Sequence, residues 1–132
     1  MKIDSQPAVP VSWGELLDKI TILEIKVRKL ANESARKNVA HELAMLTPYL
    51  ERASQSAPSL AGKLSELRHI NQSLWDIEDE IRDKERAQDF GAEFIKLARS
   101  VYHTNDKRAA VKREINRLLS SEIVEEKTYK PY

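Results

Sequence analysis

The feature that most constrains the fold of this chain is the spacing of apolar residues after position 12. Apolar side chains recur at alternating intervals of three and four residues, at Trp13, Leu16, Ile20, Leu23, Val27 and Leu30. This spacing places them along one side of an α-helix, as in helices that pack in a bundle. Ile22 and Ile25 lie on another side, so the helix is expected to contact more than one neighbour.

The residues that begin this helix form a capping box. In Ser12-Trp13-Gly14-Glu15, the Ser12 hydroxyl is expected to accept from the Glu15 amide, and the Glu15 carboxylate to reach back. Residues 1–11 contain two prolines and no helical pattern. They predict an extended N-terminal arm.

Three further helices follow from the same kind of pattern. The second is predicted from about Ala35 to Leu46, with a restart at Thr47-Pro48 and a loop over 53–59. The third is predicted to end at about Ala87. The fourth is predicted to have Asp89 as its cap and a candidate break at 104–106. The predicted fold is a single all-α domain over 1–132, an antiparallel up-and-down bundle of about four helices with a short C-terminal tail.

Composition limits the classes of function. The 22 basic and 21 acidic residues nearly cancel, which disfavours a general nucleic-acid coat. The chain has no cysteine, so it contains no disulfide, thiol nucleophile or Cys-ligated metal. The N-terminus lacks an apolar signal core, and no run approaches the roughly 20 apolar residues of a membrane span. We therefore expect a cytoplasmic protein that makes no contact with a membrane.

One arginine breaks the apolar pattern of the fourth helix. Arg108 falls in the same helical row as Leu97, Val101, Ile115 and Leu119. Polar residues at the edges of the apolar stripes of the neighbouring helices are expected to contact Arg108 about halfway along the bundle. The predicted polar cluster contains Glu24, Asn71, Glu78, Asn105, Arg108 and Lys112.

Two interpretations of this cluster remain open. A buried arginine needs a carboxylate partner, so Arg108 is expected to pair with Glu24 or Glu78 and to fix which helices are neighbours. Alternatively, the six residues form a ligand-binding site for a small anion, or the site of an enzyme. No catalytic motif is recognisable, so the sequence assigns no catalytic residue, cofactor or metal ligand.

Two weaker signals have simpler explanations. Glu80 and Asp83 form an ExxD motif of the kind that holds magnesium in helical pyrophosphohydrolases, but no paired ExxE precedes it. The stretch 96–117 carries seven basic and two acidic residues, which the acidic third helix can balance without nucleic acid.

Several blocks of the sequence are similar to a bacterial family of unknown function. They are SWGELLDKITILEIK (12–26), LWDIEDEIRDKE (74–85), FIKLARSVYHTNDKRAAVKREIN (94–116) and EEKTYKPY (125–132). The resemblance implies an association with glycosyltransferase and surface-polysaccharide genes and supplies no catalytic residue. Together with the helical pattern, it suggests a non-catalytic interaction protein that binds a partner protein or itself.

Overall fold

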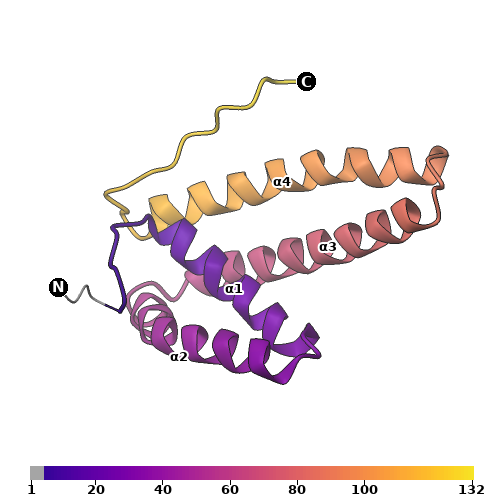
Figure 1. The fold of residues 1–132 in the computed structure, drawn as a ribbon. Helices are drawn as coiled ribbons and strands as arrows, with labels where there is room; N and C mark the ends of the chain where they lie inside the picture. The colour runs from indigo at the N-terminus through magenta and orange to yellow at the C-terminus, as the bar shows by residue number, and fades with distance from the viewer. Residues whose placement is uncertain (1–4) are drawn as a thin grey trace.

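The computed structural model describes residues 5–132, and over this range it contains helices and no strands, as predicted. Helix α1 spans Trp13–Lys29, α2 Glu33–Ser56, α3 Leu60–Arg86 and α4 Ala92–Leu118. Successive helices run in opposite directions, which gives an antiparallel bundle (Figure 1). Residues 5–11 are exposed and non-helical, in agreement with the predicted arm. Residues 1–4 of that arm lie outside the described residues.

Helix α1 is the helix around which the others pack. Its first turn confirms half of the predicted capping box, because Ser12 Oγ accepts from the Glu15 amide at 3.1 Å. The other half is wrong, since the Glu15 carboxylate contacts Lys112 of α4 instead. The buried face is wider than the predicted stripe because α1 contacts all three other helices. It consists of Gly14, Leu17, Asp18, Ile20, Thr21, Leu23 and Ile25.

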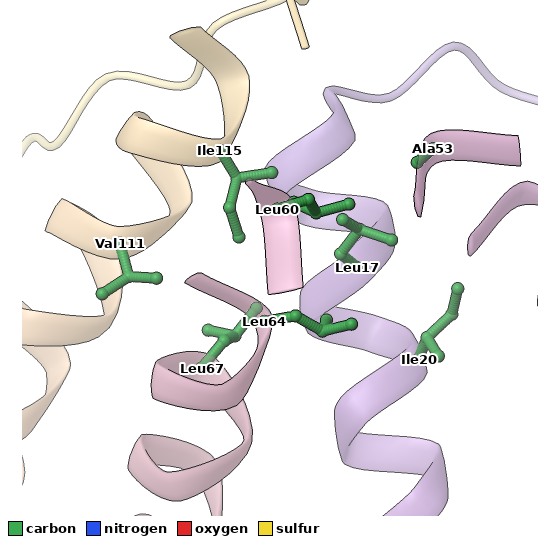
Figure 2. Packing of buried hydrophobic residues seen from close by; sticks show 8 residues of the cluster. All are labelled: Leu17, Ile20, Ala53, Leu60, Leu64, Leu67, Val111 and Ile115. Carbon is green, nitrogen blue, oxygen red and sulfur yellow. The ribbon is translucent and has the colours of Figure 1, made fainter. Parts of the chain in front are cut away.

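The apolar core lies where α1 meets the end of α2, the start of α3 and the end of α4. Figure 2 shows its eight members: Leu17, Ile20, Ala53, Leu60, Leu64, Leu67, Val111 and Ile115. Leu17, Leu60, Leu67 and Ile115 are completely buried. At roughly 25 cal/mol per Å² of apolar surface, burial of such side chains is the main stabilising contribution to the fold.

The second helix is longer than its sequence predicts. Helix α2 is continuous over Glu33–Ser56, so the predicted restart at Thr47-Pro48 and the loop from residue 53 are wrong. Proline inside a helix costs about 3 kcal/mol because it removes a backbone hydrogen bond and crowds the preceding turn. The row of Leu43, Leu46 and Leu50 packs on the core and continues past Pro48 to buried Ala53, which offsets this cost.

The fourth helix also differs from its prediction. It begins at Ala92 with Gly91 as the cap residue, while the Asp89 carboxylate accepts from the Gly91 amide at 3.2 Å and from Lys84 Nζ at 3.4 Å. It does not break at 104–106. The Asp106 carboxylate is held by Lys127 and Tyr132 of the C-terminal tail, so it does not compete for the backbone of its own helix.

Helices α3 and α4 form a hairpin that extends well beyond α1 and α2 (Figure 1). Every buried residue of α3 lies between Leu60 and Asn71, and every buried residue of α4 lies between Val111 and Asn116. No residue between 72 and 110 is buried. The outer half of the hairpin, residues 72–110, is therefore a two-helix arm that α1 borders only near its base and in which no described residue is fully buried.

Candidate functional site

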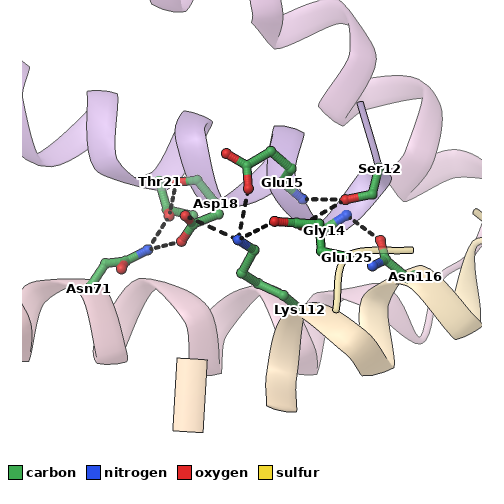
Figure 3. Close-up of polar contacts among 9 residues, drawn as sticks. All are labelled: Ser12, Gly14, Glu15, Asp18, Thr21, Asn71, Lys112, Asn116 and Glu125. Carbon is green, nitrogen blue, oxygen red and sulfur yellow. Dashed lines mark hydrogen bonds and ion pairs between the residues drawn. The ribbon is translucent and has the colours of Figure 1, made fainter. Parts of the chain in front are cut away.

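Lys112 of α4 is a largely buried charged residue at the junction of α1, α4 and the C-terminal tail. Its side chain is 14% exposed, and Nζ lies 2.8 Å from Glu15 Oε2, 3.4 Å from Glu125 Oε2 and 3.9 Å from Asp18 Oδ2. Figure 3 shows the ammonium group among these carboxylates. We call Glu15, Asp18, Lys112 and Glu125 the Lys112 cluster.

Asp18 connects this cluster to α3. Its other carboxylate oxygen, Oδ1, accepts from Asn71 Nδ2 at 2.8 Å, and the same amide group donates to Thr21 Oγ1 at 2.8 Å. Asp18, Thr21 and Asn71 are all at most 5% exposed. Because buried polar atoms are costly unless hydrogen-bonded, these contacts determine how α1 and α3 pair (Figure 3).

A second set of hydrogen bonds joins the start of α1 to the end of α4 and to the tail. The Gly14 amide donates to Asn116 Oδ1 at 2.6 Å, and the Trp13 amide donates to Ser121 Oγ at 3.2 Å. The first amides of a helix have no partner within it, so side chains of α4 and the tail satisfy them here. Ser12 Oγ donates to Glu125 Oε1 at 2.9 Å and holds the tail in place.

The electrostatics of the cluster favour its charged form. Burial alone lowers the pKa of Lys112, but the hydrogen bond to Glu15 and the charge of Asp18 raise that pKa above its ordinary value of 10.5. The hydrogen bond from Lys112 lowers the pKa of Glu15 below 4.5, against the opposing effect of burial. Lys112 is therefore an ammonium ion at neutral pH, a form that is neither a nucleophile nor a base.

These shifts predict a pH dependence of stability. Because the pKa of Glu15 is lowered on folding, its contribution is present above pH 4.5 and is lost as the pH falls through the folded pKa. We expect the free energy of unfolding, measured by urea titration, to decrease between pH 4.5 and 2.5 less steeply in Glu15→Gln than in the wild type. Glu51→Gln, an exposed substitution on α2, is the control and is expected to follow the wild type. Parallel curves for wild type and Glu15→Gln would contradict the assignment.

The structure separates the predicted polar cluster into three places. Asn71, Glu78, Asn105 and Arg108 line one cavity of about 570 Å³ between α3 and α4, to whose lining α1 contributes Ile22. We call this cavity the hairpin groove. Glu24 lies in a different cavity of about 240 Å³ beside Arg68, and Lys112 belongs to the Lys112 cluster. That the six residues bind a ligand stays a prediction.

The predicted ion pairs of Arg108 are wrong. Glu24 pairs with Arg68 at 3.3 Å and Glu78 pairs with Arg82 at 3.6 Å, both on the surface. Within residues 5–132 Arg108 forms no ion pair within 4.0 Å, although its charge contributes to the lowered pKa of Glu15. The cation that binds carboxylates between α1 and α4 is Lys112, one turn later on the helix.

Several members of the observed site were missed in the sequence. Asp18 was not predicted, because it lies outside the 3-4 spacing of the predicted stripe. Gly14 lies one turn before Asp18, and Thr21 lies one turn after it. Small or hydroxyl side chains at this spacing on one side of a helix indicate close contact with a neighbouring helix, and this was the signal available in the sequence. Glu125 and Asn116 carried no signal, because their roles depend on the path of the tail.

Comparisons with known proteins add a family and no activity. No helix in the described part of the chain combines the length and apolar character that crossing a membrane requires. Neither the curated proteins nor the solved structures contain a match to this chain. Residues 8–132 match the model of a family of unknown function, DUF6165, and the chain therefore belongs to that family.

Proposed function

We propose that this protein is a non-catalytic interaction protein that associates with a second copy of itself through the outer half of the α3–α4 hairpin. The observation that carries the proposal is the absence of any buried residue between positions 72 and 110. Two helices alone cannot bury a full apolar stripe, because each covers only one side of the other.

The apolar residues of this region are left partly in water. Leu74, Trp75 and Val101 are only half-buried and line the hairpin groove, together with Ile22 of α1. Half-buried apolar side chains that gather in one groove with a polar rim support an interface at this place. The groove lies beside α1. A helix of the partner that occupies the groove would pack against α3 and α4, as α1 does closer to the core.

The charges of the hairpin favour a second copy as the partner. Residues 74–86 of α3 carry six acidic and three basic residues, whereas residues 92–110 of α4, the part of that helix in the outer half of the hairpin, carry four basic and two acidic residues. In a twofold dimer, α3 of each copy is able to face α4 of the other, so the opposite charges meet twice.

The test is the oligomeric state over a range of concentrations. We expect the wild type to sediment as a dimer, and Trp75→Glu to raise the dissociation constant of the dimer at least about tenfold, or about 1.4 kcal/mol. Tyr49→Glu is the matched control, because Tyr49 is 42% exposed on α2 and lies outside the hairpin. A wild type that is monomeric at high micromolar concentration would refute self-association.

A second variant keeps the test independent of folding. Asp79 lies on the rim of the groove, is exposed, and forms no ion pair within the described residues. Asp79→Lys is expected to leave the thermal midpoint of unfolding unchanged while weakening the dimer, with the larger effect at low salt. Equal dimerisation by Asp79→Lys and the wild type would contradict the electrostatic part of the proposal.

The setting that we propose is an accessory role in bacterial surface-polysaccharide synthesis, within the cytoplasm. Its support is the resemblance of the four sequence blocks described above. The charged state of Lys112 and the hydrogen bonds from Asn71 to Asp18 and Thr21 support a structural rather than a catalytic role for the most buried polar residues.

A further inference from the structure

The C-terminal tail returns along α4 and is attached to it at several points. Glu125 binds Ser12 and Lys112, Lys127 binds Asp106, and the Tyr132 hydroxyl contacts Asp106 and His103. The Tyr132 ring also lies 5.0 Å from the Tyr102 ring, between centroids. Figure 1 shows the tail running back beside α4.

Between tail and helix lies a cavity of about 480 Å³, which we call the tail pocket. Its charged lining consists of Arg108, Lys112, Lys127, Lys130 and Asp106. Asp106, the only side-chain carboxylate in this lining, is already bound by Lys127 and Tyr132, and Lys112 is bound by Glu15, Asp18 and Glu125. Arg108 and Lys130 form no ion pair within residues 5–132. They are therefore cations of this lining that have no carboxylate partner among the described residues.

We propose that the tail pocket binds a small molecule in which a phosphate group is attached to a ring. The fork of an arginine side chain matches the oxygens of a phosphate, and charge-assisted hydrogen bonds of this kind are about twice as strong as neutral ones. Arg108 belongs to α4 and Lys130 to the tail, so each of the two segments that line the pocket supplies one cation.

The aromatic residues of the pocket define the second part of the ligand. Tyr102 and Tyr129 line it and are 41% and 82% exposed, so their rings have free surface for a planar or pyranose ring. A volume of about 480 Å³ lies within the range of roughly 300–1,000 Å³ of small-molecule sites. A sugar phosphate and a nucleotide both combine a phosphate group with a ring, so both classes of ligand fit this pocket.

This proposal does not depend on self-association. The tail pocket and the hairpin groove share only Asn105 and Arg108, and Lys130 borders the tail pocket alone. Calorimetric titration of the full chain with inorganic phosphate, a hexose 1-phosphate and uridine monophosphate tests it. We expect saturable binding of at least one ring compound, at least about tenfold tighter than that of inorganic phosphate.

Variants locate the binding. Arg108→Met and Lys130→Met are each expected to weaken binding of the better ring compound at least about tenfold. Arg113→Met is the control, because Arg113 is exposed on α4 outside the tail pocket.

The relative affinities of the two ring compounds distinguish sugar from nucleotide as the source. No saturable binding of either ring compound, equal affinity for inorganic phosphate, or equal loss in Arg113→Met and Lys130→Met would each overturn the proposal. Loss of binding in Lys130→Met with an unchanged dimer separates this site from the interface.

Discussion

Replacing Lys112 by methionine is expected to lower the free energy of unfolding by about 3 kcal/mol. The substitution roughly preserves the apolar stem and removes the ammonium group that lies among Glu15, Asp18 and Glu125. Asp18 is 5% exposed, so its carboxylate would remain buried with no cation beside it. Loss of one partner from a buried pair is costly chiefly for this reason. Urea denaturation at neutral pH measures the change.

A double variant distinguishes loss of the charge partner from loss of packing. In the Asp18→Asn background the buried carboxylate is absent, so Lys112→Met is expected to cost at least about 1 kcal/mol less than in the wild type. Lys107→Met, an exposed substitution on the same helix, is the control and is expected to stay within about 0.5 kcal/mol of the wild type. If Lys112→Met cost the same in both backgrounds, Asp18 would not be the group that it stabilises.

Two glycine-to-alanine substitutions are expected to change stability in opposite directions. Both glycines lie inside helices, where alanine is favoured by up to about 1 kcal/mol. A Cβ at Gly14 would lie 2.6 Å from the backbone oxygen of Lys112 and 3.0 Å from Asn116 Oδ1, whereas one at Gly62 meets nothing within 4 Å. Gly14→Ala is therefore expected to lower the free energy of unfolding by about 2 kcal/mol, and Gly62→Ala to raise it by about 0.5 kcal/mol.

The reason for the loss at Gly14 is that the nearest atom belongs to a helix backbone. A side chain can rotate away, but moving the Lys112 carbonyl requires α1 and α4 to separate. Such a shift also lengthens the hydrogen bond from the Gly14 amide to Asn116. Thermal unfolding of the two variants beside the wild type tests this pair. A rise in the midpoint of Gly14→Ala equal to that of Gly62→Ala would show that α1 and α4 are farther apart than described.

The candidate site was predicted in part from polar residues that interrupt apolar stripes. Asn71 was predicted in this way and is a buried contact between α1 and α3, because an amide near the stripe of α3 faces another helix. Arg108 was predicted to pair inside the bundle, but it faces the hairpin groove and the tail pocket. Helical phase gives the direction of a side chain and does not tell how far along the helix a neighbour extends.

Local sequence alone determined that this chain forms helices and where most of them begin. Apolar spacing and capping residues act within a few positions of the chain, so they are readable without a fold. The tertiary structure decided the rest. It explains why α2 continues through Pro48, since the packing of Leu43, Leu46 and Leu50 on the core outweighs the local cost of a proline inside a helix. It also made Lys112, not Arg108, the partner of the α1 carboxylates, because ion pairs depend on distances between segments about 100 residues apart, which no local pattern encodes.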